Sequence, residues 1–485
     1  MLCRTLKAGN KVKKSESLPI TNNLISMHQF SEEEVKRLKM SLLSWYDLNK
    51  RNLPWRKISS ENPHQRAYAV WVSEIMLQQT QVVTVIDYYN KWMKKWPTVQ
   101  DLAASNIEEV NKAWSGLGYY SRGRRLLEGA QKVVKEMSGQ MPNTAVELEK
   151  KLPGVGRYTA GAIASIALGE VTGLVDGNVV RVLSRLRMIG ALTTQPDVME
   201  TFWSLANQIV DSVRPGDFNQ SLMELGAVVC TPKTPSCGQC PVKNMCRAYS
   251  MIERSKERST KKVCKPPSID TRNDLIDIEC LIPDCNLCLP SDQPWDKELG
   301  VLNFPRKPKK AAPKKEEINV LILTLASNQD IKEETRFLIH QRPAKGLLAG
   351  LWEFPTSTGN IKMAEALSRQ YGFHEDSVRC LRSIGEITHI FSHVHHLYKI
   401  WAASLAKDQN VLSREDNFLS KWLTESQLKE TAMSTGMRKV FKVYKDSCEP
   451  QKPNFKRKRE TTIEDATTTS LKRIQPSISD FLTRK

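Results

Sequence analysis

Cys230-Thr-Pro-Lys-Thr-Pro-Ser-Cys237-Gly-Gln-Cys240-Pro-Val-Lys-Asn-Met-Cys246 is the stretch of sequence that decides the fold. Its four cysteines follow one another at gaps of six, two and five residues. Thiolates are soft ligands, and four of them this close together can enclose one metal centre. Zinc is the simpler alternative, although zinc sites usually pair two short Cys-x2-4-Cys knuckles, which this single progression lacks. The sequence therefore predicts a metal-binding loop here.

The composition agrees with metal ligation in a reducing compartment and with a polyanionic partner. Eight of the 11 cysteines lie between Cys230 and Cys288, and no apolar signal region precedes them, which argues against a secreted disulfide scaffold. A length of 485 residues allows two to four domains. No run of about 20 apolar residues is present, so we expect no membrane-spanning helix. The net charge of +19 favours nucleic acid as the partner.

The chain divides into a helical part and a later α/β part. Ser31 and Glu34 form a capping box before an apolar 3-4-3 pattern, and helical spacing continues through the first half. From about 248 to 317 the sequence is rich in lysine and proline, as in a connector. Strand patterns then follow at 318–326, 336–342, 387–391 and 397–405. We predict an N-terminal arm (1–27), a helical domain (28–250), a connector (251–317), an α/β domain (318–448) and a disordered tail (449–485).

Two motifs carry candidate chemistry. Leu152-Pro-Gly-Val-Gly-Arg157 has the pattern of a helix-hairpin-helix turn, whose glycines and backbone N–H groups can approach a phosphate without reading sequence. Asp176 follows about 20 residues downstream. Glu74 stands in an apolar helix, where a glutamate is more often a surface residue. Together, however, Glu74 and Asp176 form a pair of carboxylates, one able to protonate a leaving group and the other able to stabilise a sugar cation.

The ordered motifs resemble the MutY family of adenine DNA glycosylases, in its eukaryotic form, over about residues 28 to 448. The matching stretches are Leu53-Pro-Trp-Arg56, Ser73-Glu-Ile-Met-Leu-Gln-Gln-Thr-Gln81, Gly116-Leu-Gly-Tyr-Tyr-Ser-Arg122, Leu152 to Ala160, Val175-Asp-Gly-Asn-Val179 and the cysteine loop, which matches the [4Fe-4S] loop of endonuclease III and MutY. The resemblance implies a helix-hairpin-helix glycosylase domain with an iron-sulfur cluster, followed by a Nudix-like domain. It also implies excision of adenine, flipped out of double-stranded DNA, from opposite 8-oxoguanine or guanine.

The same resemblance assigns roles to single residues. Glu74 matches the acid that protonates adenine at N7, and Asp176 matches the carboxylate that stabilises the sugar cation; Tyr158 and Asn178 match supporting catalytic positions. Residues matching the adenine pocket are Trp55, Arg56, Leu77 and Glu224. Residues matching DNA contacts are Gln79, Leu117 and Tyr119, which wedge into the base stack, and the hairpin residues Gly154, Val155 and Gly156. Core packing is the alternative for Leu117 and Tyr119, but the flanking glycines favour an exposed tip.

Position 158 separates two kinds of glycosylase chemistry. Lyases of the endonuclease III type carry a lysine after the hairpin, which forms a Schiff base with the sugar. The residue here is Tyr158, so we predict a monofunctional enzyme that leaves an abasic site. An endonuclease III-like bifunctional lyase and a non-catalytic iron-sulfur DNA-binding scaffold remain the alternatives.

A second cysteine group lies in the connector. Cys280, Cys285 and Cys288 can bind zinc but lack a fourth ligand nearby in sequence. Animal members of the family resemble this arrangement, with a histidine before the first helix as the fourth ligand, and His28 matches that place. The gap between Cys280 and Cys285 is shorter than in the mammalian pattern. Cys264 is the rival fourth ligand, and loose cysteines in a flexible segment are the alternative to any site.

The C-terminal part resembles a Nudix domain that has lost its hydrolase site. Gly346 to Pro355 looks like the start of that fold, but 365–371 lacks the glutamates that would hold magnesium. In the family this domain recognises 8-oxoguanine, and Phe391, Ser392 and His393 match the loop that reaches the lesion. We do not expect a metal at His389, His395 and His396, because strand alternation sends neighbouring side chains to opposite faces.

The tail carries two short motifs. Gln475, Ile478, Phe481 and Leu482 resemble the box that binds the sliding clamp PCNA, although the last position is usually aromatic. Lys456-Arg-Lys-Arg459 is typical of a nuclear localisation signal, against a merely solvated basic run. The basic first 15 residues weakly resemble a mitochondrial transit peptide, and a disordered arm is the alternative. We expect a monomer.

Overall fold

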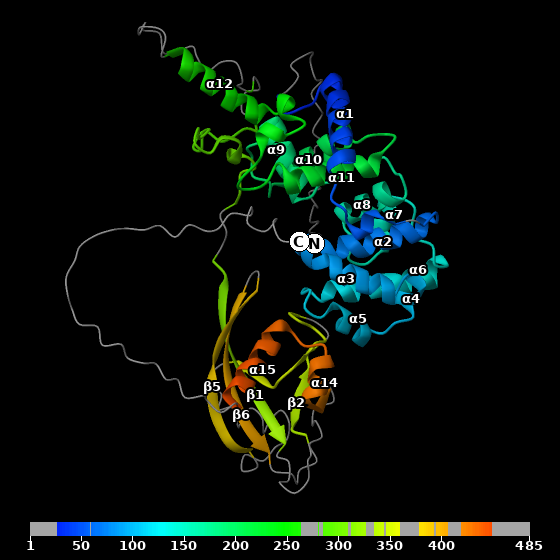
Figure 1. The fold of residues 1–485 in the computed structure, drawn as a ribbon, viewed down its shortest axis with the longest axis vertical. Helices are drawn as coiled ribbons and strands as arrows, with labels where there is room; N and C mark the ends of the chain where they lie inside the picture. The colour runs from blue at the N-terminus through cyan, green and yellow to red at the C-terminus, as the bar shows by residue number, and fades with distance from the viewer. Residues whose placement is uncertain are drawn as a thin grey trace, which may run out of the picture.

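The structure, a computed structural model, describes residues 27–58, 60–262, 280, 285–308, 312–325, 334–343, 346–358, 378–391, 394–405 and 419–448. Within them the first part of the chain is helical and the second part holds a β-sheet (Figure 1). The predicted fold class, a helical domain followed by an α/β domain, is therefore confirmed. No helix among the described residues is both long and apolar enough to span a membrane.

The helical part begins at the predicted capping box, in which the Ser31 hydroxyl accepts from the Glu34 N–H and the Glu34 carboxylate accepts from the Ser31 N–H. At Thr144 the cap of α7 is the single bond from the Glu147 N–H to the Thr144 hydroxyl. The α-helices are α1 (Glu32–Asn49), α2 (Pro63–Leu77), α3 (Val82–Lys95), α4 (Val99–Ala103), α5 (Ile107–Trp114), α6 (Ser121–Met137), α7 (Ala145–Lys151), α8 (Arg157–Ala167), α9 (Gly177–Arg187), α10 (Pro196–Ile209), α11 (Pro215–Val228) and α12 (Arg247–Lys262).

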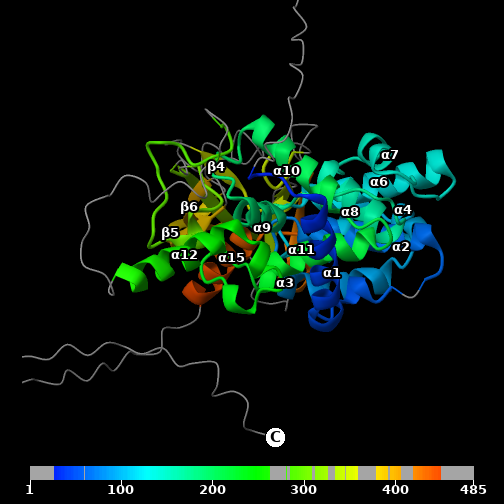
Figure 2. The same ribbon diagram turned by 90° about the horizontal axis from the view of Figure 1, so that it is seen from above.

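These helices form two lobes with separate apolar cores. One core is built mainly from α2 to α8 and includes the buried tryptophans Trp71, Trp92 and Trp114. The other is built from α1, α9, α10 and α11 around Phe202 and Phe218. Figure 2 shows α1, α9 and α11 grouped together, with α2, α4, α6 and α7 to one side. Because α8 contributes residues to both cores, the lobes meet along it.

The connector contains more structure than its composition predicts. α12 continues to Lys262, past the predicted domain boundary at 250, and a 3-10 turn forms at Gly300–Asn303. The turn packs on α12 through Val301 and Phe304, which are buried with Ala248. A few apolar residues among the lysines and prolines thus bury themselves on the helical domain.

The second part is a mixed sheet with strands β1 (Lys314–Leu325), β2 (Arg336–Gln341), β3 (Trp352–Glu353), β4 (Thr356–Thr358), β5 (Val378–Ile390), β6 (Val394–Leu405) and β7 (Ser420–Thr424). Its order is β3-β2-β1-β6-β5, with β4 paired to β1 and β7 to β2. β1 and β6 run parallel, in register from Lys314 opposite Val394 to Leu325 opposite Leu405. α14 (Glu425–Glu430) and α15 (Thr435–Cys448) follow, and Val440 and Met437 of α15 pack on the sheet face that holds Val320 and Ile322.

The two parts of the chain contact each other directly. Leu351 and Ala432 of the second part belong to the apolar core of the α2–α8 lobe. Two polar contacts also join the parts: Arg124 donates to the Ala349 carbonyl at 2.9 Å, and Lys112 pairs with Glu430 at 3.2 Å.

Candidate active site and metal centres

The predicted carboxylate pair lies where the two helical lobes meet. Glu74 comes from α2 of one lobe, Asp176 precedes α9 of the other, and Tyr158 stands in the first turn of α8 between them. The Tyr158 hydroxyl donates to Glu74 Oε2 at 2.7 Å. Glu74 is only 5% exposed, so the alternative of a helix-surface glutamate is excluded.

Asp176 is fixed by its position as the N-cap of α9. Its Oδ1 accepts from the Val179 N–H at 2.7 Å, as an N-cap carboxylate does, and its Oδ2 accepts from the Asn178 amide at 2.7 Å. Both oxygens are thus oriented by groups within three residues along the chain. The short motif Asp176-Gly-Asn178 therefore builds its own geometry, and the structure brings it to Glu74 and Tyr158.

Burial gives Glu74 an unusual proton affinity. Burial, together with the negative charge of Asp176, raises the pKa of Glu74 to about 7, although the hydrogen bond from Tyr158 and the charge of Arg56 oppose the rise. Burial also raises the pKa of Asp176, but the bonds from Val179 and Asn178 stabilise its charged form. Glu74 can therefore donate or accept a proton near neutral pH, which is what a general acid–base residue requires.

A second polar cluster surrounds Glu224 of α11, whose side chain is fully buried. Arg51 donates to Oε1 at 2.7 Å, and Arg56 donates to Oε2 at 2.8 Å. Burial alone would raise the pKa of Glu224, but the bonds from both guanidinium groups outweigh it and lower the pKa to about 2. Of the predicted pocket residues, Arg56 and Glu224 thus lie together. Arg51 joins them, and no motif in the sequence pointed to it.

A cavity of about 390 Å³ lies beside this cluster, lined in part by Trp55, Arg56, Val70 and Ile166. Glu74, Asp176 and Leu77 are not among the residues that line it. Val70 precedes Glu74 by one turn of α2, so the cavity approaches the carboxylate pair without containing it. Two of the four predicted pocket residues, Trp55 and Arg56, therefore border an open space.

The hairpin turn has the backbone that its glycines predict. Gly154 has φ +77°, and a Cβ there would meet Arg125 Cδ at 2.7 Å, so only glycine fits without a shift. Gly156 is the N-cap residue of α8, and no neighbouring atom lies near where its Cβ would be. Val155 between them is buried in the core of the α2–α8 lobe. The start of α8 is thus exposed, with the backbone conformation that the motif predicts; binding of a phosphate there stays a prediction.

Two further turns are held together by one buried arginine. Gln79 and Tyr119 both have positive φ, 54° and 48°, a conformation that non-glycine residues seldom adopt. The Arg122 guanidinium donates to the carbonyls of Ile75 and Met76 near the first turn, and to those of Leu117 and Gly118 in the second. Local strain of this kind is typical of functional sites.

The prediction of an exposed tip at 117–119 holds for only one of its two residues. Tyr119 is 42% exposed, whereas Leu117 is 5% exposed and belongs to the apolar core. The flanking glycines do mark a turn, with φ +98° at Gly116 and +78° at Gly118. The turn folds back on the domain, however, and buries the leucine.

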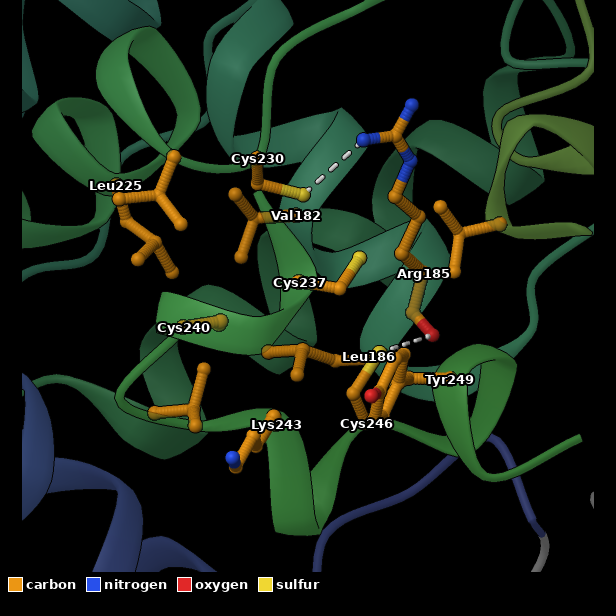
Figure 3. Close-up of a pocket in the computed structure, with 13 residues that line it drawn as sticks. Val182, Arg185, Leu186, Leu225, Cys230, Cys237, Cys240, Lys243, Cys246 and Tyr249 are labelled. Atoms are coloured by element: carbon orange, nitrogen blue, oxygen red, sulfur yellow. Dashed lines mark hydrogen bonds between the residues drawn. The ribbon is translucent and has the colours of Figure 1, made fainter. Parts of the chain in front are cut away.

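The four loop cysteines line a common cavity (Figure 3). No disulfide joins them, and burial raises the pKa of Cys240 to about 11 and that of Cys246 to about 12. Buried thiols without a partner are costly to ionise, whereas bound iron would reverse that preference. Arg185 also donates to Cys230 Sγ at 3.2 Å. An all-thiol donor set around one cavity fits an iron-sulfur cluster.

A chain of hydrogen bonds joins this loop to Asp176. Arg181 of α9 donates to the Asn178 side-chain oxygen and to the Cys230 carbonyl, both at 2.7 Å, and Asn178 in turn donates to Asp176. Sequence reasoning missed Arg181, Arg185 and Arg122. Each binds backbone carbonyls, which leave no signature in a sequence.

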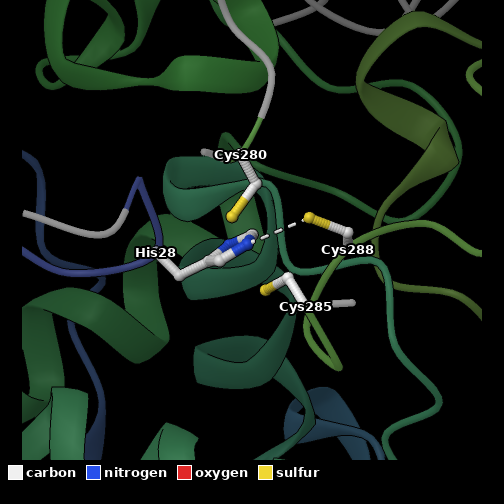
Figure 4. A group of neighbouring side chains, drawn as sticks. All are labelled: His28, Cys280, Cys285 and Cys288. Atoms are coloured by element: carbon white, nitrogen blue, oxygen red, sulfur yellow. Dashed lines mark hydrogen bonds between the residues drawn. The ribbon is translucent and has the colours of Figure 1, made fainter. Parts of the chain in front are cut away.

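The predicted connector cysteines meet His28 (Figure 4). One ligand atom from each of His28, Cys280, Cys285 and Cys288 lies within 4.8 Å of the others. The His28 Nδ1–H donates to the Arg187 carbonyl at 2.9 Å, and Nε2 lies 3.3 Å from Cys288 Sγ. Burial lowers the pKa of His28, which favours the neutral ring that a metal ligand requires. The rival ligand, Cys264, lies outside the described residues.

Several other predicted residues lie outside the described part of the chain. They are Ser392 and His393, the segment 365–371, the basic run 456–459 and the tail residues Gln475, Ile478, Phe481 and Leu482. Phe391 is described and contacts the rings of His389 and His396, with centroids 4.5 and 4.9 Å away. His396 also lies 3.2 Å from Glu316.

Three family profiles match separate parts of the chain. The profile described as "HhH-GPD superfamily base excision DNA repair protein" matches residues 72–208. "Iron-sulfur binding domain of endonuclease III" matches 230–246, the span from the first loop cysteine to the last. "NUDIX domain" matches 331–443. The predictions of an iron-sulfur loop, a helix-hairpin-helix domain and a Nudix-like domain are thereby confirmed.

Curated proteins with the name "Adenine DNA glycosylase" match most of the chain. The protein from Homo sapiens is 47% identical over 444 residues, covering 89% of this chain and 78% of its own length. The protein from Mus musculus is 48% identical over 440 residues, covering 89% and 82%. That from Schizosaccharomyces pombe is 37% identical over 439 residues, covering 85% and 90%.

Proposed function

The chain belongs to the adenine DNA glycosylase family, and from this premise we propose that its substrate is adenine opposite 8-oxoguanine in double-stranded DNA, with adenine opposite guanine as a second substrate. It is a hydrolase of base excision repair that cleaves the bond between adenine and deoxyribose. The observation that carries the mechanism is a buried Glu74 with a pKa of about 7, bonded to Tyr158 and facing the charge of Asp176.

In the proposed mechanism the flipped adenine meets Glu74, which donates its proton to N7 of the base. The bond from the sugar to N9 then breaks, and the electron pair leaves with the base. Asp176, whose charged form is stabilised by bonds from Val179 and Asn178, stabilises the positive charge on the sugar. Water adds to C1′ and gives its proton to Glu74, which restores the acid. Tyr158 and Asn178 hold the two carboxylates in place.

The same residues support a monofunctional reaction. Tyr158 stands where a lyase carries its lysine, and a phenol hydrogen-bonded to Glu74 cannot form a Schiff base. We expect no efficient covalent adduct after borohydride treatment of the enzyme with its DNA. Efficient trapping would favour the endonuclease III-like alternative.

Recognition of the mispair is proposed to use two surfaces. The strained turns at Gln79 and Tyr119 enter the base stack, with Leu117 buried beneath the second turn, and the start of α8 at Gly154 to Gly156 holds a phosphate. Phe391, Ser392 and His393 contact 8-oxoguanine from the Nudix-like domain. Trp55, Arg56, Leu77 and Glu224 surround the extruded adenine, with the Arg51–Glu224 pair keeping Arg56 in position.

Zinc is proposed as a second metal, held by His28, Cys280, Cys285 and Cys288. Three thiolates and one imidazole are a usual zinc donor set, and the bond from His28 Nδ1 to the Arg187 carbonyl orients the ring so that Nε2 lies 3.3 Å from Cys288 Sγ. When bound, zinc would tie the connector to the segment that precedes α1. We further propose that the protein acts as a monomer, binds PCNA through its tail, and resides in the nucleus, with a mitochondrial fraction directed by the basic N-terminus.

Single-turnover excision tests the central proposal. A duplex with adenine opposite 8-oxoguanine is compared with one that has adenine opposite thymine, for the unmodified chain, Glu74→Gln, Asp176→Asn and the control Glu109→Gln. Glu109 is an exposed carboxylate of α5 paired with Lys95, so its loss should leave excision unchanged. We expect release only from the lesion duplex and abolition by the first two variants. Binding of the lesion duplex without any release by the unmodified chain would favour the scaffold alternative.

A further inference from the structure

One wall of the cysteine cavity comes from a distant part of the sequence. Val301, in the 3-10 turn of the connector, lines the cavity together with Cys230, Cys237, Cys240 and Cys246. Every other lining residue lies between Val182 and Tyr249. Val301 is buried, and so is Phe304 beside it, which packs with Cys237 and Cys246 in one apolar cluster. The connector therefore closes over the cysteine loop from outside.

The turn is anchored on both sides of the cavity. Arg185 donates through Nε to the Phe304 carbonyl at 3.0 Å and through Nη1 to Cys230 Sγ at 3.2 Å, so a single side chain joins the connector to a loop cysteine. Gly300 has φ +50°, and a Cβ there would meet Ile252 Cδ1 of α12 at 2.9 Å. A glycine at 300 therefore lets the turn lie directly against the helix.

The turn is also rigid in itself. The Asn303 side chain donates to the carbonyls of Asp296 and Gly300 at 2.8 and 2.7 Å and accepts from the Asp296 N–H at 3.1 Å. Trp295 packs on Phe304, with ring centroids 5.8 Å apart. The segment 295–304 is thus a preformed apolar surface rather than a loose strand of connector.

An apolar wall has a definite effect on a metal centre. The shell around such a site controls solvent access and local polarity, and these set both its redox potential and its resistance to attack. We propose that Val301 and Phe304 form a cover that keeps water and small oxidants away from the iron-sulfur cluster held by the four loop cysteines. The proposal rests on the cluster itself and is independent of which mispair the enzyme prefers.

Ordinary core packing is the competing explanation, and a matched pair of variants separates the two. Val301→Ala and Val301→Thr change the cover, the second at nearly constant volume but with a polar group facing the cavity. Val198→Ala and Val198→Thr make the same changes at a fully buried valine of α10 that does not line the cavity. Each pair makes the same change of volume and polarity at a buried valine.

The full-length chain is purified without oxygen, and its iron content and visible absorbance are recorded. Ferricyanide is then added; it takes one electron from the cluster and becomes ferrocyanide, and loss of the visible absorbance reports decay of the oxidised cluster. The thermal unfolding midpoint of each variant is measured in parallel. We expect both Val301 variants to bleach on the order of 10-fold faster than the Val198 variants, the lower end of the effect that outer-shell changes have on metal sites.

Equal bleaching rates of the Val301 and Val198 variants would overturn the proposal of a cover. Rates that follow the unfolding midpoint alone, whichever valine is changed, would also overturn it, because general loosening would then explain them. Faster bleaching of Val301→Thr at a midpoint matching that of Val198→Thr supports the cover. A purified chain without iron would instead overturn the premise of a cluster, and the cover with it.

Discussion

Replacing Tyr158 by phenylalanine should move the pH dependence of adenine excision. The Tyr158 hydroxyl donates to Glu74 Oε2 at 2.7 Å and favours the ionised carboxylate, holding the pKa of Glu74 at about 7 against burial. A hydrogen bond to a charged group contributes roughly 1.5–3 kcal/mol, and one pKa unit corresponds to about 1.36 kcal/mol. Without the hydroxyl the pKa of Glu74 should therefore rise by about 1 to 2 units.

The assay is single-turnover excision between pH 5.5 and pH 9 on the lesion duplex (roughly the range in which a shifted carboxyl titrates). If protonated Glu74 is the acid, the rate of the unmodified chain falls as pH rises through about 7, and the fall for Tyr158→Phe should begin at a higher pH. Each pH profile is compared by its shape, so that a loss of rate that is equal at every pH does not affect the comparison. Tyr68→Phe is the control, because its buried hydroxyl donates to the Trp96 carbonyl, away from Glu74. A variant profile that falls at the same pH as the unmodified chain would refute the role of this bond.

Three further changes test the buried charges. Because the pKa of Glu74 is raised from 4.5 to about 7, ionisation of Glu74 opposes folding as pH rises through that range. Glu74→Gln should therefore raise the free energy of unfolding by up to about 3 kcal/mol above pH 7 but change it little near pH 4. Urea unfolding at both pH values measures the difference. Arg122→Lys should lower the free energy of unfolding by about 2 kcal/mol, since an amine cannot reach the carbonyls of both the Gln79 and the Tyr119 turn. An unchanged urea midpoint would contradict this expectation. Glu224→Gln should lower the free energy of unfolding by about 3 kcal/mol. This lies near the lower end of the range for a broken buried ion pair, because Arg51 is 38% exposed. A lower thermal unfolding midpoint would confirm the loss.

The sequence predicted the parts of the site that short motifs determine. The Asp176-Gly-Asn178 motif orients its own carboxylate, the glycines of the hairpin set their own backbone, and the cysteine spacing closes its own loop. His28 could be placed with the connector cysteines only through the family resemblance, since 260 residues separate it from Cys288. The structure supplied the distance that joins them.

The parts of the site that the sequence could not predict depend on contacts that no sequence motif marks. Arg51, Arg122, Arg181 and Arg185 hold the site together, yet outside the Glu224 pair most of their acceptors are backbone carbonyls that any residue provides. Leu117 was expected at an exposed tip because glycines flank it, but the direction of a turn depends on the core beneath. Val301 and Phe304 were hidden by the lysine- and proline-rich composition around them.

The distance along the chain between the cysteine loop and the connector turn also has a consequence for biosynthesis. Phe304 leaves the ribosome 58 residues after Cys246, which at roughly 5–20 residues per second is a delay of about 3 to 12 s. During that interval the four thiols can come together while the segment that later closes over them is still unmade. Vectorial synthesis thus provides a period in which iron and sulfide can be delivered without unfolding any part of the chain, and the emergence of Phe304 ends it.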